Sequence, residues 1–153
     1  MMMNRLAALL LLCVLASITP AEAQFACPDP YDNAGACAPV TASATDTTGA
    51  TTATLPAAAG KTTYICGFYF SGTNATAANP ATAVTVTGAA IGTMTFGFPT
   101  LAAGATVPNT RPINPVFTTC IAASASNTAI TVTGPALGAG ATQATLSAWG
   151  YNY

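Results

Sequence analysis

An eleven-residue segment occurs twice in this chain, as TAVTVTGAAIG over residues 82–92 and as TAITVTGPALG over residues 128–138, with eight identical positions. In both copies Val or Ile alternates with Thr before a glycine. Alternation with a period of two is typical of a β-strand that buries one face, and β-branched side chains favour the extended backbone. Glycine after such a run indicates a turn. The repeat therefore predicts two equivalent half-buried strands, which end in turns at Gly88 and Gly134.

The segments around the two copies are also alike. A strand-like run with one cysteine precedes each copy, TTYICGFYF at 62–70 and VFTTCIA at 116–122, and an aromatic-Gly-aromatic triplet follows, at 96–98 and 149–151. The chain thus predicts a three-strand module that is used twice, over residues 62–98 and 115–151. Pro and Asn interrupt the sequence at short intervals, and no apolar stripe of helical period follows the first 23 residues. We expect an all-β fold, an antiparallel β-sandwich or a jelly-roll.

The first 23 residues have the features of a cleavable signal peptide. Arg5 supplies the positive charge, and the apolar run Leu6–Ile18 is shorter than the roughly 20 residues that span a bilayer. Ala21-Glu22-Ala23 matches the A-x-A cleavage pattern. We therefore expect the mature protein to begin at Gln24, to be secreted, periplasmic or attached to the cell surface, and to lack a stable membrane span.

Four cysteines follow the predicted leader, namely Cys27, Cys37, Cys66 and Cys120. An even number of cysteines in an exported protein of this size predicts disulfide bonds, and four cysteines allow three pairings. We favour Cys27 with Cys37 and Cys66 with Cys120, so that one bridge closes a short loop and the other joins the two modules.

The chain after the leader divides into two parts by composition. Residues 24–59 are predicted to be an N-terminal loop segment that holds the short disulfide, and residues 60–153 are predicted to form the β-sandwich domain. Within the first part, residues 41–59 are rich in Ala and Thr and fit either a flexible linker or an early strand. We favour one edge strand over Ala50–Leu55.

Most catalytic and ion-binding constellations are excluded by composition. The chain has no histidine, and after the leader its only cationic side chains are Lys61 and Arg111. Serine therefore lacks the usual base that would activate it, and a basic surface for nucleic acid cannot form. Zinc has no histidine ligand, and its thiolate ligands would be oxidised after export. We expect a protein that is not an enzyme, has no metal or other cofactor, and does not bind nucleic acid.

The carboxylates leave two alternatives open. Asp29, Asp32 and Asp46 are the only ones after the leader, and they all precede the repeated strands. A paired-carboxylate hydrolase would need them to meet in one cleft. Asp29 and Asp32 with Asn33 also fit calcium, which prefers oxygen ligands, although a bridge between the flanking cysteines explains the same segment without metal.

Three aromatic residues are candidates for a ligand-binding surface. Tyr64, Tyr69 and Trp149 lie in strand-like segments, and exposed rings on one sheet face bind sugar rings by stacking. The alternative is that these rings pack in the core or across strands. Strict alternation would place Tyr64 on one face with Phe68 and Phe70, and Tyr69 on the other with Ile65.

The low charge of the chain bears on its partners. Three cationic and four anionic residues give a net charge of −1, and proteins with little charge repulsion tend to associate. Strand addition at sheet edges is a natural means of such association. We therefore expect an exported, non-catalytic structural or surface-interaction protein for adhesion or assembly, with its own copies or another surface protein as partner. The alternative is a carbohydrate-binding module.

Two resemblances agree with this expectation. The segment GKTTYICGF at 60–68, followed by Cys120-Ile121, resembles small all-β domains of uncharacterised exported or phage-associated surface proteins, which carry a K-x-x-Y-[VI]-C-G strand and a later C-[IL] strand. Those domains often have a cysteine after a Gly-Thr-Asn triplet, whereas Ala75 follows the triplet in this chain, so their disulfide pattern does not transfer. The C-terminal segment is also similar to pilin subunits of chaperone-assembled fibres, which end in a strand with an aromatic residue, although the cysteine spacing differs.

Overall fold

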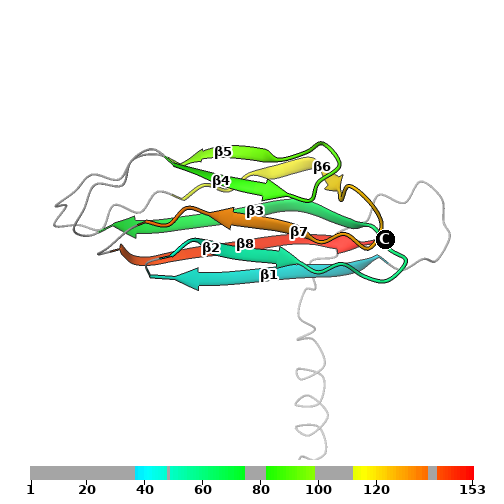
Figure 1. The fold of residues 1–153 in the computed structure, drawn as a ribbon, viewed down its shortest axis with the longest axis horizontal. Helices are drawn as coiled ribbons and strands as arrows, with labels where there is room; N and C mark the ends of the chain where they lie inside the picture. The colour runs from blue at the N-terminus through cyan, green and yellow to red at the C-terminus, as the bar shows by residue number, and fades with distance from the viewer. Residues whose placement is uncertain (1–36, 48, 75–81, 99–111, 138–140) are drawn as a thin grey trace, which may run out of the picture.

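A computed structural model describes residues 37–47, 49–74, 82–98, 112–137 and 141–153. These residues form eight β-strands and no helix (Figure 1). The strands are β1 (Ala38–Asp46), β2 (Thr51–Leu55), β3 (Thr63–Asn74), β4 (Thr82–Thr87), β5 (Met94–Phe98), β6 (Val116–Ala122), β7 (Ile130–Gly134) and β8 (Ala141–Asn152). The prediction of an all-β fold is confirmed.

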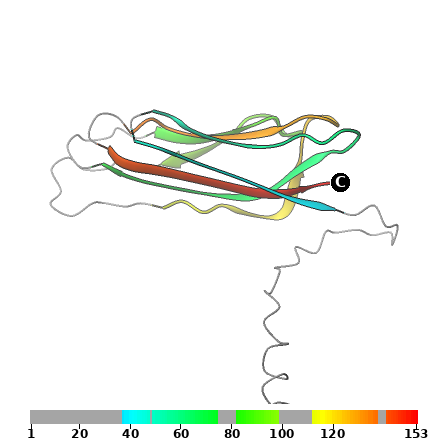
Figure 2. The ribbon, with the colours of Figure 1, turned by 90° about the horizontal axis from the view of Figure 1, so that it is seen from below.

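The strands form two antiparallel sheets of four strands each, which lie face to face as two layers (Figure 2). Sheet A has the order β1-β8-β3-β6, and sheet B has the order β2-β7-β4-β5. Apolar side chains from both inner faces fill the space between the layers, as in a β-sandwich. Of the two predicted architectures, the structure is consistent with the sandwich.

The two copies of the repeated segment form β4 and β7, which pair with each other inside sheet B. Their register places Val86 opposite Val132, which is its own counterpart in the repeat. Equivalent residues meet in this way where two equal units are related by a two-fold rotation. The preceding strands β3 and β6 also pair with each other, in sheet A, and a disulfide joins their equivalent cysteines, Cys66 and Cys120.

The third strands of the two modules differ. Strand β5 stays beside β4 in sheet B, whereas β8 crosses to sheet A and lies between β1 and β3. The predicted three-strand module therefore describes the order of strands along the chain, but its two copies share the same arrangement only in their first two strands.

The sandwich begins before residue 60, the boundary that composition predicts. Strand β1 pairs with β8 over nine consecutive positions, and β2 forms an edge of sheet B beside β7. The prediction of an edge strand near Ala50–Leu55 is confirmed by β2. Strand β1 escapes prediction because its inward side chains include only small Ala42 and Ala44 besides Val40, so its alternation carries little hydrophobic contrast.

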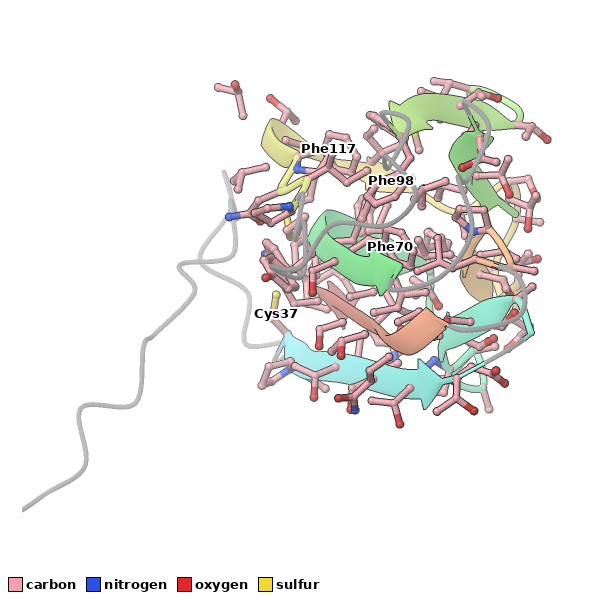
Figure 3. The ribbon with its side chains drawn as sticks, turned by 90° about the vertical axis from the view of Figure 1, so that its left-hand side faces the viewer. Cys37, Phe70, Phe98 and Phe117 are labelled. Carbon is pink, nitrogen blue, oxygen red and sulfur yellow. A yellow bond between two sulfur atoms is a disulfide. The ribbon has the colours of Figure 1, made fainter. Side chains whose placement is uncertain are left out.

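The core is built on phenylalanine rings that meet between the sheets. Phe70 of β3 and Phe98 of β5 lie edge to face, with ring centroids 5.0 Å apart (Figure 3). Phe68 contacts Phe96 with the same geometry, and both Phe68 and Phe70 are fully buried. The ring of Phe70 also covers Gly134 of β7, where a Cβ atom would lie 2.3 Å from the phenyl ring. Glycine at 134 therefore serves close packing of the two layers.

An irregularity in β3 changes which residues face the core. The register of β3 against β6 and β8 shifts between Ile65 and Gly67, as at a β-bulge, where one extra residue inverts the alternation. As a result Ile65 lies in the core with Phe68 and Phe70, and Tyr64 does not. The sequence prediction that Tyr64 shares a face with these phenylalanines is wrong for this reason.

Of the two predicted disulfides, Cys66–Cys120 is present. Cys37 is also disulfide-bonded, and its predicted partner Cys27 lies outside the described residues, as does the predicted signal peptide at 1–23. Disulfides persist mainly in oxidising compartments, so the Cys66–Cys120 disulfide indicates an oxidising environment outside the cytosol. In the described part of the chain, no helix has the length and apolar character needed to cross a membrane.

Candidate functional site: the aromatic face of sheet A

The three predicted ligand residues lie together on the outer surface of sheet A. Tyr64 is opposite Tyr151 in the pairing of β3 with β8, Gly67 is opposite Trp149, and Tyr69 is opposite Ser147. The side chains that alternate with these, such as Phe68 and Leu146, are buried in the core. We call the surface formed by Tyr64, Tyr69, Trp149 and Tyr151 the aromatic face.

Trp149 lies across Gly67 on the neighbouring strand. A Cβ atom at Gly67 would be 2.5 Å from Cζ2 and 2.9 Å from Cε2 of the indole, so the benzene part of the ring occupies the space that a side chain would take. Glycine thus provides a seat for the ring on the sheet surface. Trp149 is half-buried rather than enclosed.

Tyr64 and Tyr151 form a stacked pair, with ring centroids 4.7 Å apart and ring planes 15° apart. Tyr151 is only 7% exposed, while Tyr64 is half-buried. Tyr151 was not among the predicted site residues, although its spacing of two residues from Trp149 signals the shared face. This pair supports the aromatic face by packing, and leaves Tyr69 and Trp149 without a ring contact among the described residues.

Burial and the neighbouring Tyr64 phenol both raise the pKa of Tyr151 above its ordinary value of 10.0. The folded protein therefore holds this phenolic proton more tightly than the unfolded chain does. Its contribution to stability is complete below pH 10.0 and is lost as the pH rises through the higher folded pKa.

We expect the urea concentration at the unfolding midpoint of the wild type to decrease when the pH is raised from about 9 to about 11. The decrease should be larger than in Tyr151→Phe, which has no proton to lose at this site. Urea unfolding at the two pH values measures the difference. Equal losses in both proteins would show that Tyr151 does not contribute to alkaline unfolding.

Hydroxyl side chains surround the rings on the same face. Thr41, Ser43 and Thr45 of β1 are exposed there, opposite Trp149, Ser147 and Thr145 of β8. Ser71 of β3 lies opposite Thr145 from the other side. No residue that β1, β3 or β8 places on this face is charged. The surface thus combines aromatic rings with neutral donors and acceptors.

The carboxylates do not form a described site. Asp29, Asp32 and Asn33 lie outside the described residues, so the hydrolase and calcium alternatives stay predictions. Asp46 ends β1, where its side chain accepts a hydrogen bond from the backbone N–H of Gly49 in the turn toward β2. Within the described ranges, no cluster of three or more His, Cys, Asp or Glu residues is able to hold a metal ion.

Comparisons with models of protein families, with curated protein sequences and with solved structures find no match. Function is therefore inferred from the chemistry of the residues themselves.

Proposed function

We propose that this protein is an exported, non-catalytic surface-interaction module that assembles with its own copies, or with another surface protein, by strand addition at the edge of β1. The predicted leader and the disulfide support export. A chain without histidine and with almost no charge supports a role in contact rather than in chemistry.

The observation that carries the proposal is the lack of charge on the sheet edges. Strands β1 and β6 border sheet A, and β2 and β5 border sheet B. Asp46, at the last position of β1, is the only charged residue in these four strands. Soluble β-proteins commonly place lysine or other charges on edge strands, because free backbone N–H and C=O groups otherwise recruit another strand. These edges lack that protection.

Strand β1 is the edge best suited to such pairing. It is nine residues long, whereas β2 and β5 have five residues each. Its register with β8 runs without a shift from Ala38 to Asp46, while the pairing of β6 with β3 is interrupted at Gly67. Among the described strands none pairs with the outer side of β1, and a long regular edge is the best template for an added strand.

A lysine in the middle of this edge tests the proposal. In the Ser43→Lys variant, two copies that pair through β1 would bring their introduced ammonium groups close together, and like charges on paired strands repel. We expect light scattering of the non-reduced wild type to show a mass that grows with concentration. The Ser43→Lys variant should need at least about tenfold more protein to reach the same mass.

The matched control is Ser147→Lys. Ser147 lies directly opposite Ser43, on the same face but on the inner strand β8, so this substitution adds the same charge without changing an edge. This variant should assemble as the wild type does. A wild type that stays monomeric at every concentration, or equal effects of the two lysines, would contradict assembly through β1.

A further inference from the structure

We propose that the aromatic face binds a neutral carbohydrate chain, with Trp149 and Tyr69 as the stacking residues. This extends the proposed function from contact between proteins to attachment to a polysaccharide surface, and it does not depend on self-association. Its basis is the arrangement of rings, hydroxyls and charge on sheet A.

Trp149 and Tyr69 are diagonal neighbours on the adjacent strands β8 and β3. Trp149 is opposite Gly67, and Tyr69 follows Gly67 by two residues on the same face. Diagonal neighbours on adjacent strands lie about 7–8 Å apart. At this spacing one extended ligand would contact both aromatic rings. Neither ring is used in a contact with another aromatic residue of the described chain, and both are half-buried rather than enclosed.

The packing around the rings keeps the platform ordered before a ligand arrives. Gly67 lets the indole of Trp149 rest on β3, and the stacked pair of Tyr64 and Tyr151 fills the next position on the same face. A surface that is already ordered loses less conformational entropy on binding. The apolar faces of sugar rings are suited to such rings, because aromatic π-systems attract weakly polarised C–H groups at short range.

The rest of the face selects a polar but uncharged ligand. Ser43, Ser147 and Ser71 offer hydroxyl groups that donate and accept hydrogen bonds, as do the threonines beside them. The side chains that β1, β3 and β8 place on this face are all uncharged, so these strands offer no group to pair with a carboxylate or phosphate, whose desolvation would go uncompensated. Neutral hydroxyl-rich chains fit these properties, whereas nucleic acids and acidic polysaccharides do not.

Trp149 is the only tryptophan of the chain, so its fluorescence reports on the proposed site in the unmodified protein. The experiment measures quenching by acrylamide in the presence of xylan, glucomannan or hydroxyethylcellulose, with alginate as an acidic control. We expect at least one neutral polysaccharide to protect Trp149 from the quencher, and alginate to give no protection. Unchanged quenching with all three neutral polymers, or equal protection by alginate, would overturn the proposal.

Variants then identify the stacking residues. In native gels that contain the protecting polysaccharide, Trp149→Ala and Tyr69→Ala should each bind at least about tenfold more weakly. Tyr153→Ala is the control, because Tyr153 is 49% exposed but lies beyond the end of β8. If Trp149→Ala fails to fold, Tyr69→Ala still decides, because this variant leaves the tryptophan available for the quenching assay. Unchanged binding by folded Tyr69→Ala would remove Tyr69 from the site and overturn the two-ring platform.

Failure of this inference is distinguishable from failure of assembly. Wild-type protein that is diluted until light scattering shows only monomers should still be protected by the polysaccharide, while Trp149→Ala should still grow in mass with concentration. Loss of this protection in the diluted, monomeric wild type would mean that only the assembled protein binds, which contradicts binding by a single aromatic face.

Discussion

Replacing both Cys66 and Cys120 by alanine is expected to lower the free energy of unfolding by about 4 kcal/mol. The bond spans 54 residues of sequence, and cross-links that close long loops restrict the unfolded chain most. It also joins β3 of the first module to β6 of the second, so its loss removes a covalent link between the two halves of the repeat. A typical domain has only about 5–15 kcal/mol of net stability, so much of the fold's margin depends on this bond.

Urea unfolding of the double variant under non-reducing conditions measures this loss. The Cys27→Ala/Cys37→Ala variant is the comparison, because the predicted short loop gives a smaller entropic contribution of about 3 kcal/mol. A loss below about 1 kcal/mol in the Cys66→Ala/Cys120→Ala variant would show that packing between β3 and β6 suffices without the bond.

Truncation of Phe70 to alanine is expected to cost about 3–5 kcal/mol, which is typical for a buried phenylalanine. The ring is fully buried, contacts Phe98 of sheet B and covers Gly134, so its removal leaves a cavity between the two layers. Chemical denaturation gives the change in free energy. Phe117→Ala should cost less, because Phe117 is only partly buried on edge strand β6.

Gly134→Ala provides a second test of the same contact. In a protein that retains Phe70, the added methyl group would meet the phenyl ring of this residue, and overpacking of this kind costs about 1–3 kcal/mol. In the Phe70→Ala background the same substitution should cost much less, because the methyl group enters the cavity. Equal costs in both backgrounds would contradict the close approach of Phe70 to Gly134.

The strands that could be predicted are those whose hydrophobic side chains stand out clearly from the residues around them. The Val-Thr alternation of the repeat identified β4 and β7, and the cysteine-bearing aromatic runs identified β3 and β6. Strand β1 was not predictable, because Ala, Ser and Thr differ too little in hydrophobicity to mark a buried face. The crossing of β8 to sheet A was not predictable either, since local pattern specifies a strand but not the partner with which it pairs.

The candidate site was predicted by composition but not by geometry. Tyr64, Tyr69 and Trp149 were identified as possible ring platforms, yet strict alternation separated Tyr64 from Tyr69. The bulge at Cys66 brings Tyr64 and Tyr69 to one face. The sequence does not reveal this extra residue, because the residues of β3 around it are apolar on both faces. Gly67 was the missed indication, because a glycine inside a strand often marks a bulge or a close approach.

Hydrogen exchange of the β1 backbone amides, measured at low and high protein concentration, tests the central claim most directly. If copies assemble through this edge, the amides of β1 that point away from β8 should exchange more slowly at high concentration, while those already paired with β8 change little. Growth in particle mass without any gain of protection in β1 would place assembly on another surface and contradict the proposed mode of association.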